Sequence, residues 1–221
     1  MSNIILQHWS GHIDSLTQMS IDNIKEYSEF CGADYRLMTG DCFHPRLSSP
    51  CQKVVMLSEQ FDEYDNVVMM DADMFTRTNL NKNIFNESGM GRHWGIQDKL
   101  VENLQRRFPL LGDPKYPYWG GSIYKFDRET RKLLRSHLEV HEFSQFDGNY
   151  EDEGILHRLA VRAKMPINEN TYLERDRWNK SSFEPDVEDS YIVHIRPKRV
   201  QGGPKYPKIE NYMLLSAKGI I

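Results

Sequence analysis

The sequence predicts an α/β fold in which a mostly parallel, Rossmann-like sheet is flanked by helices. Two observations support this prediction. Apolar strand patterns alternate with helical patterns over the first 70 residues, and the third strand pattern, residues 66–70, shows no polar alternation. Alternating strands and helices form parallel sheets, and a strand without alternation is typical of a sheet that is covered on both faces.

The first two strands are short apolar runs with one helix between them. The strands are predicted at residues 3–7 and 33–38. Between them, apolar residues recur at helical spacing from Ile13 to Cys31, and Gly32 follows where a helix ends.

A second helix precedes the third strand. It follows a proline-flanked loop and carries Val54, Leu57 and Phe61 on one face. The strand at 66–70 then completes a strand–helix–strand–helix–strand order. In such sheets ligands bind at the carboxyl ends of the strands, so the segments that directly follow the three strands are expected to form a site.

The remainder of the chain has a less regular pattern. Helices are predicted at residues 96–108, 128–138 and 151–163, and strands at 122–126 and 190–195. No linker composition separates the two parts, so one domain spanning residues 1–221 is expected.

Composition and charge argue against several classes of protein. The 221 residues include 28 basic and 32 acidic side chains, a net charge of −4, which disfavours a general nucleic-acid binder. No apolar run approaches the roughly 18 residues of a membrane span, and no signal peptide is recognisable. Three cysteines at spacings of 11 and 9 match neither a disulfide framework nor a zinc motif. We therefore expect a cytoplasmic protein with reduced thiols.

The most specific motif is Asp71-Ala72-Asp73, directly after the third predicted strand. Two carboxylates at positions i and i+2, separated by a small residue, can approach one cation, and oxygen ligands favour Mg²⁺, Ca²⁺ or Mn²⁺. A metal held there would bind a diphosphate and neutralise the charge that develops as it leaves. Acidic residues also simply end strands, but the buried strand and the ligand edge of the sheet favour a metal site.

The segment from Lys53 to Asp73 resembles the metal-site region of nucleotide-sugar glycosyltransferases with the GT-A fold, and residues 27–35 are similar to the same families. More narrowly, size and pattern resemble the small glycosyltransferase domain of large algal DNA viruses that glycosylate the capsid protein. The resemblance implies a GT-A-like fold with a nucleotide-binding half at about residues 1–75 and an acceptor-side half at about 76–221. It also implies host cytoplasm if the protein is viral, and further domains if the chain belongs to a longer polypeptide.

The resemblance also implies ligands for the metal and the diphosphate. In related retaining families a late strand ends in a histidine that completes the metal site, and His194 fits that place. An imidazole beside two carboxylates shifts the preference towards Mn²⁺, with Mg²⁺ as the alternative. The families follow this histidine with a glycine and a lysine, whereas here a basic segment follows, in which Lys198 and Lys205 are the two candidate contacts to the diphosphate.

Two further motifs resemble parts of the sugar and acceptor pocket. Trp119-Gly120-Gly121 and the following serine resemble the loop beside the sugar, where glycines admit close backbone approach and an indole stacks on an apolar sugar face. Asp152, in an acidic helix start, is the candidate catalytic residue, which would hydrogen-bond the donor sugar or the acceptor. The competing interpretation is that acids at a helix N-terminus are favoured by the helix dipole alone.

Three residues near the nucleotide complete the predicted site. His8 and Trp9 follow the first strand and by position would face the base, on which aromatic stacking is worth about 1–3 kcal/mol. Lys53, on the helix before the metal strand, would reach the donor. A solvent-exposed helix lysine is the alternative interpretation of Lys53.

These features predict a metal-dependent hexosyl or pentosyl transferase that moves a sugar from a UDP-sugar to a hydroxyl of a glycan or glycoprotein. Retention of the anomeric configuration is expected from the His194 analogy. Two alternatives stay open. One is a non-catalytic nucleotide-sugar or carbohydrate-binding domain. The other is a metal-dependent phosphatase with Asp71 as nucleophile, although Phe75 stands where that motif has Thr or Val.

Overall fold

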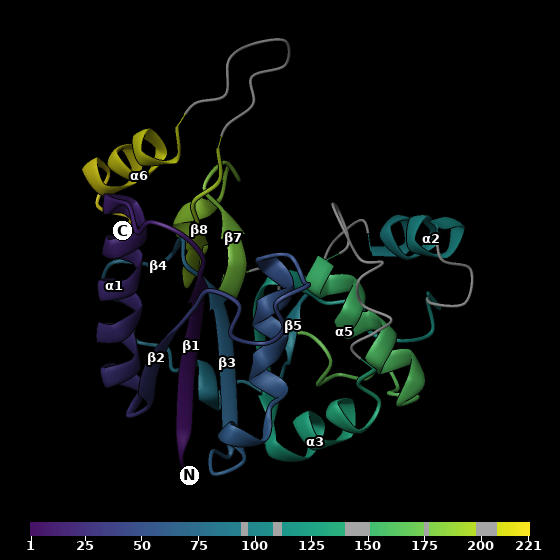
Figure 1. The fold of residues 1–221 in the computed structure, drawn as a ribbon. Helices are drawn as coiled ribbons and strands as arrows, with labels where there is room; N and C mark the ends of the chain where they lie inside the picture. Colours follow the sequence, from purple (N-terminus) through teal and green to yellow (C-terminus); the bar gives the residue numbers. More distant parts are fainter. Residues whose placement is uncertain (94–96, 108–111, 140–150, 175–176, 198–206) are drawn as a thin grey trace.

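The strands form two sheets in the computed structural model, which describes residues 1–93, 97–107, 112–139, 151–174, 177–197 and 207–221. The larger sheet has the order β2-β1-β3-β6-β5 and the smaller one β4-β8-β7 (Figure 1). The larger sheet contains β1 (Asn3–Trp9), β2 (Asp34–Thr39), β3 (Asn66–Asp71), β5 (Gly91–Arg92) and β6 (Gly120–Asp127). The smaller sheet contains β4 (Met74–Thr76), β7 (Lys180–Ser181) and β8 (Ile192–His194).

Helices cover both faces of the larger sheet, with α1 on one face and η1, α3 and α5 on the other (Figure 1). The α-helices are α1 (Ser15–Cys31), α2 (Gln97–Arg107), α3 (Arg128–Ser136), α5 (Glu151–Arg162) and α6 (Lys208–Ala217). The 3-10 helices are η1 (Pro50–Leu57), η2 (Glu59–Phe61), η3 (Ile84–Asn86), η5 (Arg177–Asn179) and η6 (Val187–Asp189). The predicted fold class is confirmed.

The central strands are buried on both faces, as the absence of polar alternation predicts. Val67 packs in the core on the η1 side, and Val68, whose side chain points the opposite way, packs in the core on the α1 side. β1 pairs in parallel with both β2 and β3, and His8 lies opposite Asp71 in that pairing. The carboxyl ends of the two strands therefore meet at one edge of the sheet.

Helix α1 is capped at both ends, and its Gly32 stop is the one that the sequence predicts. Asp14 caps the amino end, where its side chain accepts a hydrogen bond of 2.7 Å from the Thr17 backbone N–H. Gly32 ends the helix with a φ of 65°, the left-handed conformation that glycine adopts without strain. Ile24 and Tyr27 lie on the face that packs against the sheet.

The predicted helix before β3 differs in the structure. It consists of two short 3-10 helices, η1 and η2, separated by Ser58 with an extended backbone. Cys51 to Leu57 are all buried, so this segment has no solvent-exposed face and is not amphipathic. Its polar side chains find partners inside the protein: Gln52 accepts hydrogen bonds from two backbone N–H groups, and Lys53 points to the sheet edge.

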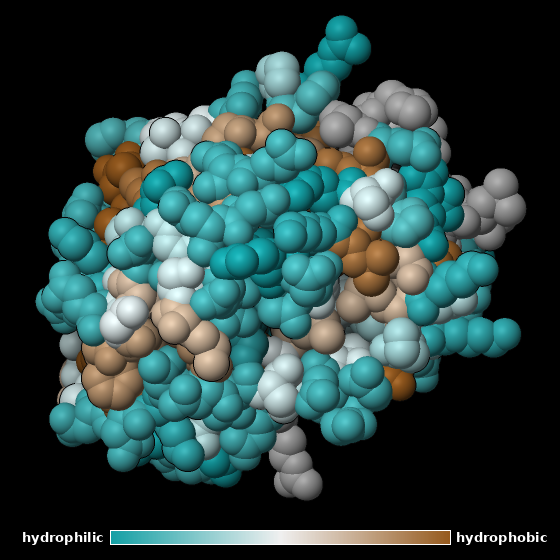
Figure 2. Space-filling model, turned by 90° about the horizontal axis from the view of Figure 1, so that it is seen from below, coloured by the Kyte–Doolittle hydropathy of each residue, from teal (hydrophilic) through white to brown (hydrophobic). Residues whose placement is uncertain are grey.

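The smaller sheet was not predicted as a unit. β4 follows Asp73 directly and pairs antiparallel with β8, so that Met74 lies opposite His194. Residues far apart in the sequence are therefore joined beside the carboxyl end of β3. The face of the molecule at the amino end of β1, which lies away from this edge of the sheet, is mostly hydrophilic with scattered apolar groups (Figure 2). Among the described helices, none combines the length and apolar character that a membrane crossing requires.

Candidate functional site

A cavity of about 280 Å³ lies at the carboxyl edge of the larger sheet, where the strand order predicts a site. It is bounded by the ends of β1 and β3, the start of β6, the first turn of α5 and the end of β8. Nine of the predicted site residues line it: His8, Trp9, Lys53, Asp71, Ala72, Asp73, Gly121, Asp152 and His194.

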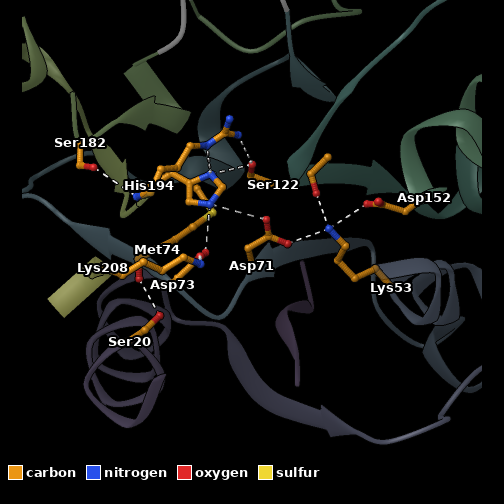
Figure 3. Close-up of polar contacts among 12 residues, drawn as sticks. Ser20, Lys53, Asp71, Asp73, Met74, Ser122, Asp152, Ser182, His194 and Lys208 are labelled. Carbon is orange, nitrogen blue, oxygen red and sulfur yellow. Dashed lines mark hydrogen bonds and ion pairs between the residues drawn. The ribbon is translucent and has the colours of Figure 1, made fainter. Parts of the chain in front are cut away.

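Asp71, Asp73 and His194 gather on one side of this cavity, and we call them the Asp–His cluster (Figure 3). One ligand atom from each residue lies within 4.8 Å of the others. The Nε2 atom of His194 is 3.1 Å from Asp73 Oδ1 and 3.9 Å from Asp71 Oδ2. The pairing of β4 with β8 produces this arrangement, because it places His194 beside the segment that follows Asp73.

The Asp–His cluster fits a divalent cation. Asp73 Oδ1 is buried and takes part in no hydrogen bond within the described part of the chain, and it lies 3.1 Å from His194 Nε2 as an ion pair. A buried acceptor without a partner is costly, and a cation would satisfy it. Two carboxylates and one imidazole form a donor set suited to Mn²⁺.

Asp73 stays ionised despite its burial. Burial acts to raise the Asp73 pKa, but the contacts with His194 and Lys208 outweigh it and hold the pKa below its usual range. The Lys208 ammonium, at the start of α6, pairs with Asp73 Oδ2. The carboxylate is therefore available as a ligand at neutral pH.

Lys53, Asp152 and Glu153 occupy the other side of the cavity, and we call them the lysine cluster. Lys53 Nζ donates to Asp71 Oδ1 at 2.7 Å and to the Gly121 carbonyl, and it pairs with Asp152 Oδ2 at 2.8 Å. Burial lowers the Lys53 pKa, but the charges of Asp152 and Asp71 outweigh it, so the pKa lies above its ordinary value. The lysine is charged and links η1 to β3, β6 and α5.

The two acids of the lysine cluster differ in their partners. Asp152 Oδ2 also accepts a hydrogen bond of 2.7 Å from the Tyr124 hydroxyl, and burial raises the Asp152 pKa. Glu153 accepts hydrogen bonds from the Gly121 N–H at 2.7 Å and from the Tyr118 hydroxyl at 3.0 Å. Burial and the charge of Asp152 raise the Glu153 pKa to about 7. Sequence analysis did not select Glu153, although it stands next to Asp152 in the same helix start.

The aromatic and glycine motif is divided between the cavity and the core. Gly121 lines the cavity, and a Cβ there would lie 2.6 Å from Glu153 Oε1, so a larger residue would displace the Glu153 side chain. Gly120 begins β6 and lies opposite Arg92 of β5. Trp119 is fully buried and donates its indole N–H to the Thr171 carbonyl at 2.9 Å. Its ring is therefore enclosed by protein and not exposed for stacking on a sugar.

His8 and Trp9 lie at the end of β1. His8 Nε2 donates to the Gly40 carbonyl at 2.8 Å, and burial lowers the His8 pKa, so the ring is neutral at pH 7. Trp9 is partly exposed, and its indole N–H donates to the His12 carbonyl at 3.0 Å. The two side chains form the β1 wall of the cavity.

The basic segment that follows His194, residues 196–208, contributes two cations to the region, but neither is one of the two predicted contacts. Lys198 and Lys205 lie outside the described residues. Arg196 lines the cavity with its Nε 3.3 Å from His194 Nδ1, and Lys208 pairs with Asp73. Arg196 was not predicted as a site residue, although its position two residues after His194 in the sequence indicates that it lies close to the metal ligands.

Comparison with known proteins places the fold. No family model matches the chain, and no curated protein matches its sequence. Among solved structures, a glycosyltransferase involved in the glycosylation of the major capsid of PBCV-1 is 14% identical, with a TM-score of 0.54 over 98% of this chain and 100% of that one. The galactosyltransferase LgtC, in complex with donor and acceptor sugar analogues, is 10% identical, with a TM-score of 0.54 over 97% of this chain and 95% of that one. The protein therefore has the GT-A type of fold found in these glycosyltransferases.

Proposed function

We propose that this protein is a metal-dependent glycosyltransferase that moves a sugar from a UDP-sugar to a hydroxyl group of a glycan or glycoprotein. The observation that carries the proposal is the Asp–His cluster, which lies at the carboxyl edge of the sheet and leaves one buried carboxylate oxygen unsatisfied. The likeness in fold to LgtC with its donor and acceptor analogues, and to the PBCV-1 capsid glycosyltransferase, supports the reaction class.

In this proposal Asp71, Asp73 and His194 hold Mn²⁺, with Mg²⁺ as the alternative. A metal bound there supplies Lewis-acid stabilisation of the departing diphosphate. Lys53 fixes the orientation of Asp71 by holding its Oδ1, so that Oδ2 is turned towards His194. The protein thus contributes two oriented carboxylates and one imidazole to the site.

The nucleotide would lie along the β1 wall and the basic side of the cavity. Trp9 presents a partly exposed ring for the base, and His8 is a neutral hydrogen-bonding group beside it. Arg196 adds positive charge for the diphosphate. We extend this role to Lys208, because a metal bound to Asp73 would release the Lys208 ammonium from its ion pair with that carboxylate. Lys198 and Lys205 remain further candidates for the same contact.

The transferred sugar would contact Gly121 and Asp152. Asp152 is fixed by Lys53 and Tyr124, so its carboxylate serves as a held hydrogen-bond acceptor rather than as a mobile nucleophile. Retention of the anomeric configuration is proposed from the His194 analogy, and because Asp152 is held in place we favour a front-face reaction over a covalent intermediate. The bond from the anomeric carbon to the phosphate oxygen breaks, the acceptor oxygen bonds to the same face, and the departing phosphate takes the acceptor proton.

The test is nucleotide release from a panel of UDP- and GDP-sugars in Mn²⁺, in Mg²⁺ and in EDTA, with Asp71→Asn as the control variant. Release of UDP from one sugar, supported by Mn²⁺ and abolished by EDTA and by the variant, is the expected result. Tight Mn²⁺-dependent UDP binding without release in the presence of glycan acceptors would favour the binding-domain alternative. Phosphate release from simple esters would favour the phosphatase.

A further inference from the structure

Ser122 contacts the imidazole of His194 on the side away from the carboxylates. Its Oγ lies 2.8 Å from His194 Nδ1, while Nε2 of the same ring faces Asp73 (Figure 3). Both side chains are buried, with 2% and 7% of their residue surfaces exposed. Ser122 belongs to β6 of the larger sheet and His194 to β8 of the smaller one, so this bond joins the two sheets at the cavity.

The two nitrogens of the ring have different tasks if His194 is a metal ligand. A neutral imidazole carries one N–H, and only the nitrogen without a proton binds a metal. For Nε2 to bind beside Asp71 and Asp73, the proton must be on Nδ1. That N–H is buried and requires an acceptor.

Two neighbours of Nδ1 favour opposite forms of the ring. A serine hydroxyl both donates and accepts, so Ser122 Oγ is able to receive the Nδ1 proton. The guanidinium of Arg196 only donates. Its Nε is 3.3 Å from Nδ1 and favours the form with a bare Nδ1, in which Nε2 carries the proton and cannot bind a metal.

We propose that Ser122 is a positioning residue of the metal site, whose hydroxyl accepts the Nδ1–H of His194 and so directs the Nε2 lone pair towards the cation between Asp71 and Asp73. The proposal rests on the proposed function only in that the Asp–His cluster binds a metal. Groups that hydrogen-bond to a ligating histidine commonly contribute 10–100-fold to metal affinity. Ser122 thereby sets the metal affinity without touching the metal.

The test is the Mn²⁺ affinity of four proteins, the parent, Ser122→Ala, Ser122→Thr and Ser182→Ala, measured by electron paramagnetic resonance with and without UDP. Ser182 is the matched control, because its hydroxyl accepts from the Arg196 backbone N–H instead of from the imidazole. We expect Ser122→Ala to bind Mn²⁺ about 10–100-fold more weakly. Ser122→Thr keeps the hydroxyl and should restore most of the affinity, and Ser182→Ala should bind like the parent.

Thermal unfolding and ¹⁵N NMR of the histidine rings separate positioning from a general structural role. With diamagnetic Zn²⁺ in the site, the His194 Nδ1–H should be observed in the parent and should exchange faster in Ser122→Ala. Parent-like Mn²⁺ affinity in a folded Ser122→Ala, or an equal loss in Ser182→Ala, would overturn the positioning role and leave the proposed function intact. A parent protein whose Mn²⁺ binding is insensitive to Asp71→Asn would overturn the metal site itself, and with it both proposals.

Discussion

The Asp–His cluster and the lysine cluster share one cavity, yet their charges are compensated in different ways. In the lysine cluster a buried ammonium contacts Asp71, Asp152 and a backbone carbonyl. In the Asp–His cluster Asp73 keeps a buried oxygen without a hydrogen bond, and its lysine partner, Lys208, has a side chain that is 41% exposed.

In the proposed function this difference corresponds to different tasks on the two sides. The charges of the lysine cluster are compensated within the chain, so that side would receive a neutral ligand such as a sugar. The Asp–His cluster has a buried oxygen without a hydrogen bond and a partly exposed cationic partner, so that side would receive the metal. Asp71 belongs to both sides, because one of its oxygens is held by Lys53 and the other faces His194.

Removing the buried cation should have the largest effect. Lys53→Met leaves Asp71 and Asp152 without their shared partner in a buried site, which typically costs about 3–5 kcal/mol of unfolding free energy. Urea unfolding measures this loss. The control is Lys132→Met, whose exposed contact with Glu129 is worth less than about 1 kcal/mol. Equal unfolding free energies of the two variants would contradict the claim that Lys53 compensates the charges of the lysine cluster.

Removing a carboxylate from the other side should affect binding more than folding. Asp73→Asn takes away one ligand oxygen charge, and we expect Mn²⁺-dependent UDP release to fall on the order of 10²-fold. Initial rates at saturating donor measure the change. Asp62→Asn, which disrupts only a peripheral pair with Arg135, should keep the parent rate. A parent-like rate for Asp73→Asn would remove this residue from the metal site.

The raised Glu153 pKa predicts a pH-dependent difference in stability. The pKa of Glu153 is about 7 in the folded protein against an ordinary value of 4.5, so folding favours the protonated form. The parent therefore loses stability as pH rises from about 4.5 to 7, and little more above 7. Glu153→Gln cannot ionise, so its stability relative to the parent should increase over that window by on the order of 3 kcal/mol.

Urea unfolding of both proteins at several pH values between 4 and 8.5 measures this difference. The critical feature is the sign of the change, because the stability of Glu153→Gln relative to the parent must increase as the pH rises. A stability difference that is constant across the window would show that Glu153 is ionised in the folded protein.

The smallest effect is expected where the backbone approaches the lysine cluster. Gly121→Ala places a Cβ against the Glu153 carboxylate, and overpacking of this kind costs about 1–3 kcal/mol. In a Glu153→Ala background the obstacle is gone, so the cost of Gly121→Ala should shrink. A double-mutant cycle in urea measures the coupling, and strictly additive effects would place the clash elsewhere.

Local patterns were sufficient for β1, β2, β3 and β6 of the larger sheet, but not for its two-residue strand β5. The apolar run of β3 and the Gly32 stop of α1 correspond to short-range rules of burial and backbone conformation, so both are visible in the sequence. The same rules failed for η1, because its burial on every side depends on elements that pack around it from elsewhere in the chain.

The burial of single aromatic and polar side chains was not predictable by the same route. Trp119 and Gly121 lie two residues apart in one motif, yet the first is in the core and the second borders the cavity. Trp119 precedes the first residue of β6, so strand alternation does not place its side chain. Glu153 and Asp152 illustrate the same point, since their separate partners come from β6 and η1.

The sequence by itself determined the α/β order, the place of Asp71 and Asp73 at the end of a buried strand, and the candidacy of His194. The first two features depend on neighbours along the chain, and the candidacy of His194 came from the resemblance to a family. Only the tertiary structure decided that β4 pairs with β8 to bring His194 to the carboxylates, that Lys53 holds Asp71, and that Ser122 supports the imidazole. Those contacts join residues 18 to more than 100 positions apart, and their free energy comes from burial and charge pairing that no local pattern encodes.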